Sequence, residues 1–145
     1  MKTLLLVLLA VALATCITVS LAVPAIAADG YVGCSNSDDV IPFDLLTYAV
    51  GTAIPLPAAY PYPYDATMSP DGTEVWVPDA SGDHVVVIDV ATNTITHTIS
   101  VGEYPNSVVF TDDGSTALVS ARDGDYVTLI KTSDYSITDS LYVLT

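Results

Sequence analysis

The distribution of apolar and polar residues predicts short β-strands separated by tight turns. From residue 63 onward, apolar runs alternate with clusters of Gly, Asp, Ser and Asn, such as SPDG at 69–72 and DASGD at 79–83. Short runs bounded by turn residues are typical of strands. The centre of HVVVID at 84–89 is continuously apolar, which suits a strand buried on both faces. Residues 94–101 alternate between apolar and polar, which suits a half-exposed outer strand.

The same pattern occurs twice at a fixed spacing. Residues 63–99 align without a gap with residues 105–141, and ten of the 37 aligned positions are identical. A period of about 40 residues built from four short strands predicts one blade of a β-propeller per copy. We expect Trp76 and its counterpart Leu118 to lie in the core between blades. The structural repeat positions that we expect in the turns and core of the two copies are Asp71, Gly72, Trp76, Val87, Ile88, Asp113, Gly114, Leu118, Leu129 and Ile130.

A partial third copy precedes these two. Residues 38–44 resemble residues 83–89 at a shift of 45, and this copy lacks the first strand of the unit. The sequence therefore predicts an all-β chain of about 2.75 four-stranded antiparallel blades, or roughly eleven strands, in an open arc. We expect a partial blade at 28–62 and blades at 63–104 and 105–145. The third strand of each blade should be the most buried, so that an aspartate at Val87 or Leu129 unfolds the chain.

The repeat resembles the YVTN family of β-propeller repeats, which is often found in secreted and surface-layer proteins. The matching segments are SPDG at 69–72, VVVID at 85–89, Thr92 and Val101-Gly102, and the likeness covers residues 30–145. The tetrad that gives the family its name differs: WVPD stands at 76–79, LVSA at 118–121 and YVGC at 31–34. The resemblance implies a binding or scaffold module that is a piece of a longer propeller. Because 2.75 blades cannot close a ring, several copies that complete a ring together are the alternative.

The amino-terminal residues predict export. A single positive charge at Lys2 precedes an almost wholly apolar run at 4–23, and Ala25-Ile26-Ala27 forms a small-x-small cleavage site. This pattern predicts a signal helix over residues 1–27 that is removed from a secreted, cell-surface or periplasmic protein. Two alternatives stay open: an uncleaved membrane anchor, and a lipoprotein with its lipid on Cys16.

Charge excludes two classes of partner. The formal net charge is −14. All 17 acidic residues lie beyond residue 27, where Arg122 and Lys131 are the only arginine and lysine. Nucleic acids and anionic membranes both require basic surfaces, so we expect neither as a partner after signal cleavage. The only cysteine beyond residue 27 is Cys34, which leaves no intramolecular disulfide.

No arrangement of residues indicates catalysis. The two histidines, His84 and His97, do not recur between copies, and we expect both to be surface side chains. We predict no catalytic, cofactor or metal site, although the Asp-rich turns at 79–83 and 123–125 leave calcium open. The YPYPY run at 60–64 is either an exposed aromatic patch for carbohydrate or peptide, or a loop that packs on the blade edge.

The sequence therefore favours a non-enzymatic binding module whose ligand it does not identify. The alternative is a fragment of a propeller enzyme, because the resemblance extends to lactonases and to quinone- or haem-dependent oxidoreductases with seven blades. Those chemistries use several basic or histidine residues at the mouth of the central channel, and this chain has few of either.

Overall fold

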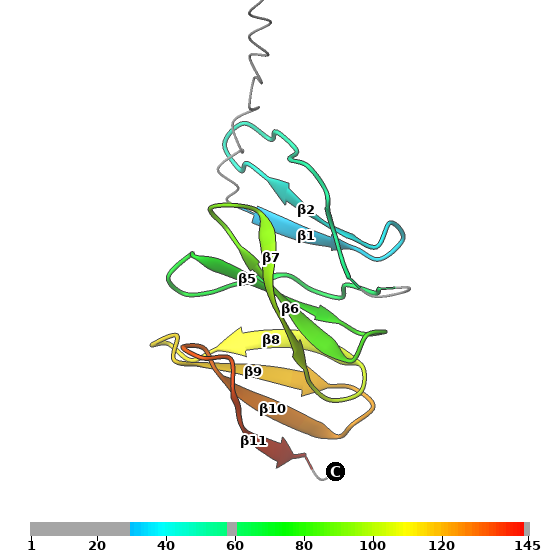
Figure 1. The fold of residues 1–145 in the computed structure, drawn as a ribbon, viewed down its shortest axis with the longest axis vertical. Coiled ribbons are helices and arrows are strands. Elements are labelled where there is room, and N and C mark those ends of the chain that lie inside the picture. The colour runs from blue at the N-terminus through cyan, green and yellow to red at the C-terminus, as the bar shows by residue number, and fades with distance from the viewer. Residues whose placement is uncertain (1–29, 58–60, 144–145) are drawn as a thin grey trace, which may run out of the picture.

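The computed structural model describes residues 30–57 and 61–143, and within them the chain is all-β. Eleven strands in this described part of the chain form three antiparallel sheets stacked along the long axis of the molecule (Figure 1). Each sheet is a meander in which strands consecutive in sequence are neighbours. The chain is therefore a partial β-propeller, as the repeat predicted. The predicted signal helix over residues 1–27 lies outside the described residues.

The first sheet has three strands and the other two have four. The first contains β1 (Gly30–Cys34), β2 (Asp39–Phe43) and β3 (Ile54–Pro55). The second contains β4 (Thr67–Met68), β5 (Glu74–Asp79), β6 (His84–Asp89) and β7 (Thr94–Ser100). The third contains β8 (Pro105–Phe110), β9 (Thr116–Ala121), β10 (Tyr126–Lys131) and β11 (Ile137–Tyr142).

The backbone repeats as closely as the sequence does. Two turns in every sheet contain a non-glycine residue in the left-handed region, which L-residues adopt rarely. These residues are separated by 45 and then by 42 positions, the two shifts that relate the sequence copies. They are Asp38, Asp83 and Asp125 in one turn (φ 62°, 54° and 51°), and Tyr48, Asn93 and Tyr135 in the other (φ 58°, 54° and 58°).

The second sheet is buried on both faces. One face packs on the first sheet through Val75, Val77, Val86 and Ile88 against Val40, Ile54 and Leu56. The opposite face packs on the third sheet through Trp76, Val85, Val87 and Ile99 against Val108, Ala117, Val119 and Ile130. Burial of β6 from both sides explains its continuous apolar run, because both sets of alternating side chains meet a neighbouring sheet.

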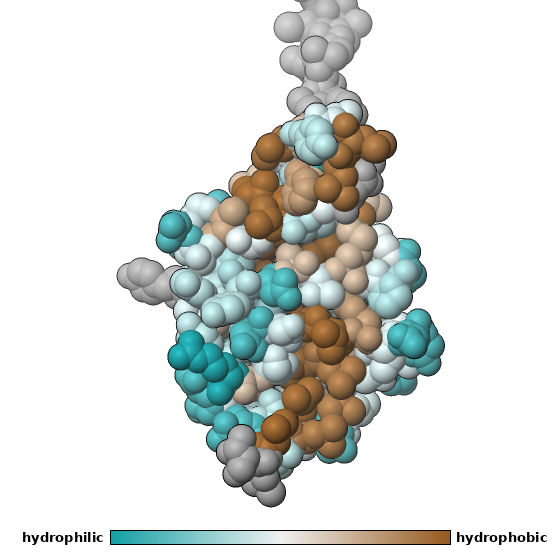
Figure 2. Space-filling model, turned by 180° about the vertical axis from the view of Figure 1, so that it is seen from behind, coloured by the Kyte–Doolittle hydropathy of each residue, from teal (hydrophilic) through white to brown (hydrophobic). Residues whose placement is uncertain are grey.

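The third sheet has one covered face and one open face. Val109, Leu118 and Leu129 are paired across neighbouring strands and therefore point to the same side. Val109 is 56% exposed and the other two are half-buried. The expectation that Leu129 is as buried as Val87 is wrong, because no sheet covers this side within the described residues. Seen from behind, hydrophobic residues form a band along the molecule (Figure 2).

The first sheet also has an open apolar face. Val32 is 47% exposed and Val50 is 68% exposed. Cys34 ends β1 as a half-buried free thiol. Among the described residues, no helix is long and apolar enough to span a membrane.

Candidate functional site

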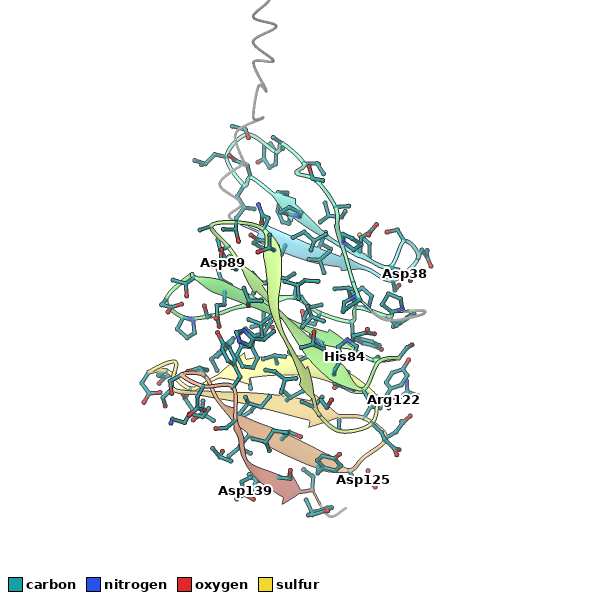
Figure 3. All side chains as sticks on the ribbon, viewed as in Figure 1. Asp38, His84, Asp89, Arg122, Asp125 and Asp139 are labelled. Atoms are coloured by element: carbon teal, nitrogen blue, oxygen red, sulfur yellow. The ribbon has the colours of Figure 1, made fainter. Side chains whose placement is uncertain are left out.

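The loops of the sheets gather at two opposite edges, because antiparallel strands reverse direction at every turn. One edge carries residues 61–64, 79–84, 102–105 and 121–126, which we call the tyrosine rim. Figure 3 shows Asp38, Arg122 and Asp125 along this edge and Asp89 at the opposite one.

The Pro-Tyr run at the tyrosine rim alternates between buried and exposed residues. Pro61 and Pro63 are buried, whereas Tyr62 is 41% exposed and Tyr64 is 51% exposed. Pro63 also forms an isolated β-bridge with Asp79. An extended chain points successive side chains to opposite sides, so the prolines anchor the segment while the tyrosines face outward. Residues 58–60, which begin the run, lie outside the described residues.

Three tyrosines and an arginine form a continuous strip on this rim. The ring centroids of Tyr62 and Tyr64 lie 5.9 Å apart, and those of Tyr64 and Tyr104 lie 6.3 Å apart in an edge-to-face arrangement. The guanidinium carbon of Arg122 lies 4.8 Å from the centroid of the Tyr104 ring. The strip thus combines side chains from two consecutive blades, and it ends in a cation over an aromatic face.

Hydrogen bonds fix the backbone beneath the strip. The Tyr62 N–H donates to Asp79 Oδ1 at 2.7 Å, and the Ala80 N–H donates to the Tyr62 carbonyl at 3.0 Å. In the next blade the Tyr104 N–H donates to Asp83 Oδ1 at 3.0 Å. The Arg122 N–H donates to the Tyr104 carbonyl at 3.0 Å. The β5–β6 hairpin therefore holds the backbone of both Tyr62 and Tyr104, and the β9–β10 hairpin of the third sheet also holds Tyr104.

A buried acid–histidine pair supports Tyr62. Asp79 is fully buried, and its Oδ2 lies 3.3 Å from Nε2 of His84, which is only 9% exposed. His84 Nδ1 donates to the Gly82 carbonyl at 2.8 Å. The expectation that His84 is a surface side chain is wrong. The ring packs over Gly82, where a Cβ atom would approach it to 2.1 Å, and it faces an acceptor at both nitrogens.

The opposite edge carries the predicted turn aspartates. The pKa of Asp113 is lowered to about 2 because its carboxylate accepts the Ser115 N–H and the hydroxyls of Thr111 and Ser115. The pKa of Asp71 is lowered for the same reason, by Ser69 and Thr73. Between these turns lies a cavity of about 460 Å³, whose lining includes Asp71, Glu74, Asp112 and Asp113.

These carboxylates close their own turns, and the structure does not gather them around a common point. Within residues 30–57 and 61–143, no group of three or more His, Cys, Asp or Glu side chains is arranged to hold a metal ion. The calcium alternative for the Asp-rich turns therefore gains no support from the described residues.

Trp76 lies at the centre of the contact between the second and third sheets. Its ring packs edge-to-face on Phe110, with centroids 5.5 Å apart, and its Nε1 donates to Glu74 at 2.9 Å. Tyr135 of the third sheet also donates to Glu74 and stacks on His97 at 3.8 Å between centroids. His97 is thus exposed but covers an aromatic ring.

The sequence pattern did not predict Tyr104, Arg122 or the Asp79–His84 pair as residues of a site. A signal for Tyr104 was present, because Tyr62 and Tyr104 occupy the same repeat position, directly before the prolines that open the two copies. No comparable signal marks Arg122 or the buried pair, since neither recurs in the other copy.

Solved structures share this fold. The hydrazine synthase of Kuenenia stuttgartiensis superposes with a TM-score of 0.70 at 24% identity, over 80% of this chain and 33% of that one. A putative 6-phosphogluconolactonase from Bacteroides fragilis gives 0.66 at 20% identity, over 78% and 35%. The WD40 repeats of RRP9 give 0.68 at 14% identity, over 77% and 34%.

These likenesses show the β-propeller fold alone, because propellers carry many unrelated activities. The chain spans about a third of the length of these structures. No protein-family model and no curated protein matches it.

Proposed function

We propose that this chain is part of a secreted or cell-surface β-propeller of the YVTN type that acts in binding and scaffolding. The observation that carries the proposal is the open face of the third sheet. Its apolar residues occupy the repeat positions at which the second sheet packs on the third. Leu118, Val127, Leu129 and Leu141 correspond to Trp76, Val85, Val87 and Ile99.

The open face of the first sheet is the counterpart of this surface. Val32, Ile41, Phe43 and Val50 correspond to Val77, Val86, Ile88 and Ile95, which pack between the second sheet and the first. Repeat units of this kind bury their apolar faces against neighbouring units. The partner that fits both faces is therefore another blade, either from a longer propeller or from a second copy of the chain.

Light scattering at moderate salt tests this proposal. The isolated protein should self-associate, because apolar sheet faces of this size mark interfaces. Replacement of Leu118 and Leu129 by glutamate should reduce the association without unfolding the protein. A monomer whose state does not change with this double substitution would contradict the proposal.

We also propose that the protein is exported and loses residues 1–27. Mass spectrometry of the mature protein should find Ala28 at the amino terminus. An intact Met1 in a membrane fraction would support the anchor alternative. The net charge of −14 supports a module without nucleic-acid or anionic-membrane partners.

A fragment of a propeller enzyme is the second candidate. The likeness to a putative 6-phosphogluconolactonase and to a dihydro-heme d1 dehydrogenase favours it at the level of the fold. Assays of the isolated protein with a panel of lactones and redox dyes are expected to detect no turnover. Turnover that is lost on substitution of His84 or His97 would support the enzyme instead.

A further inference from the structure

We propose that the tyrosine rim binds arginine side chains of a basic polypeptide partner. The proposal is independent of the blade faces, because none of Tyr62, Tyr64, Tyr104 and Arg122 belongs to the core clusters between the sheets. It assigns a ligand class to a surface that faces away from the neighbouring blades.

The rim already makes the proposed contact once within the chain. Arg122 lies over Tyr104 with its guanidinium carbon 4.8 Å from the ring centroid, although 57% of the Arg122 side chain is exposed. A cation within about 6 Å of an aromatic face is attracted to the ring quadrupole. Tyr62 and Tyr64 offer two further exposed rings beside it. The strip therefore has room for cations from outside the chain.

The charges around the strip complement a cationic partner. Four exposed carboxylates lie on the loops of the rim, and Arg122 is the one Lys or Arg among its residues. Asp123 pairs loosely with Arg122, at 3.6 Å. The four exposed carboxylates of the rim are those of Asp83, Glu103, Asp123 and Asp125. Their negative field attracts basic segments and repels phosphorylated or uronate-bearing ligands.

The surface is organised before any ligand arrives. Hydrogen bonds to Asp79 and Asp83 hold the backbone of Tyr62 and Tyr104, and buried prolines hold the segment between Tyr62 and Tyr64. A tyrosine has few rotatable bonds, so ordering it costs little conformational entropy. Tyrosine and arginine are the residue types that most often dominate the energy of protein interfaces.

Arginine fits this surface better than lysine or a neutral sugar. Its planar guanidinium stacks on a ring and at the same time donates paired hydrogen bonds to a carboxylate, whereas the ammonium of lysine is a strongly hydrated point charge. A neutral sugar would use the rings and leave the surrounding carboxylates without a charged partner. The combination of rings and acids is what selects the guanidinium.

Binding of peptides to the purified protein at physiological salt tests the proposal. The probes are a flexible peptide with four Arg-Gly-Ser repeats and the same peptide with lysine in place of arginine. We expect the arginine peptide to bind more tightly. Tyr64→Ala should weaken its binding about two- to fivefold, and loss of both Tyr62 and Tyr64 about tenfold. Thermal melts of each variant verify that the fold is retained.

Two matched controls separate the rim from the general acidity of the protein. Tyr48→Ala removes a tyrosine that is 81% exposed at the opposite edge and should leave the affinity unchanged. Asp83→Asn keeps an acceptor for the Tyr104 N–H but removes a charge from the rim, and it should weaken binding more than Asp112→Asn. Asp112 is exposed at the opposite edge. Each variant loses one carboxylate, so the two have equal net charge.

The following outcomes would overturn the proposal. Equal affinity for the arginine and lysine peptides, or equal effects of Tyr64→Ala and Tyr48→Ala, would show general attraction by a negative protein. Binding of a neutral oligosaccharide that depends on Tyr64, without binding of the arginine peptide, would assign the rim to carbohydrate. None of these results affects the proposal that the open faces of the first and third sheets pack on another blade, because light scattering tests that proposal through the oligomeric state.

Discussion

Tyr135, in the turn between β10 and β11, donates its phenol hydrogen to Oε1 of Glu74 on β5. The other carboxylate oxygen of Glu74 accepts the indole N–H of Trp76 at 2.9 Å. One carboxylate thus serves donors from two consecutive sheets. The contact between these sheets is therefore not only apolar, since a polar bridge closes it at the edge opposite the tyrosine rim.

Tyr135→Phe should destabilise the protein in a pH-dependent way. Burial, the hydrogen bond to Glu74 and the charge of Glu74 together raise the pKa of Tyr135 to about 12. Because the folded-state pKa lies above the ordinary value of 10, the stabilisation is complete below about pH 10 and is lost toward pH 12. Since Tyr135 is only partly buried, we expect a loss of about 1 kcal/mol at pH 7, measured by urea unfolding.

Tyr142→Phe is the matched control for this prediction, because Tyr142 is 74% exposed on β11. Its stability should follow that of the unmodified protein from pH 7 to pH 11. If Tyr135→Phe lost no more stability than this control, the bridge to Glu74 would contribute nothing.

Val87→Asp and Leu129→Asp should differ strongly although they occupy the same repeat position. Val87 is fully buried between the second and third sheets, whereas Leu129 is half-buried on an open face. A buried unpaired charge is strongly unfavourable, so Val87→Asp should unfold the protein at room temperature. Leu129→Asp should cost no more than about 1 kcal/mol in the monomer, because substitutions on an open surface have small effects. Circular dichroism melts measure both.

The dependence of the melting temperature on protein concentration shows whether Leu129 contacts another molecule or lies on an open face of the monomer. If Leu129 contacts another blade in solution, Leu129→Asp should lower the melting temperature at high protein concentration and have little effect at high dilution. An equal and complete loss of structure in both variants would mean that the open face is covered within the monomer.

The repeat period predicted the fold because local pattern and topology agree in this architecture. Asp38, Asp83 and Asp125 share one unusual backbone conformation at the spacing of the sequence copies. Short hairpins join neighbouring strands, so the order along the chain fixes the order in each sheet. The burial of Leu129 could not be predicted in this way, since it depends on whether a further sheet is present, and a repeat position carries no such information.

The candidate site was less predictable from the sequence. The Pro-Tyr run signalled an aromatic loop, but the strip also needs Tyr104 and Arg122, which lie on separate loops of the next blade. Such convergence results from the stacking of two sheets. His84 was misassigned because a polar residue at a turn is usually exposed, whereas here Gly82 and Asp79 create a buried place for the ring.

Acid should destabilise the protein over a defined pH range through its turn aspartates. The pKa values of Asp113 and Asp134 are lowered to about 2 by hydrogen bonds within their turns. A lowered folded-state pKa gives stability that is complete above the unfolded value of about 3.9 and is lost as the pH falls toward 2. Asp113→Asn should therefore show a shallower decline in melting temperature from pH 5 to pH 2. A decline identical to that of Asp112→Asn would contradict this assignment.

Removal of one member of the Asp79–His84 pair should be among the most damaging changes at the tyrosine rim. Asp79→Ala leaves the Tyr62 N–H without its acceptor and His84 Nε2 buried without the carboxylate. A buried polar group that loses its hydrogen-bond partner costs about 1–3 kcal/mol. Chemical denaturation should record this loss, and Asp83→Asn, which changes an exposed aspartate of the same turn, should cost much less.

The third sheet supplies a rescue for the damaged pair. At the same repeat positions it has Ala121 and Tyr126, and the Tyr126 ring packs over Gly124 as the His84 ring packs over Gly82. The double substitution Asp79→Ala/His84→Tyr therefore replaces the buried Asp79–His84 pair by the alanine and tyrosine that the equivalent hairpin of the third sheet accommodates. We expect the double variant to be more stable than Asp79→Ala alone, which is a non-additive effect between contacting residues. Strictly additive losses in urea unfolding would show that Asp79 and His84 act independently.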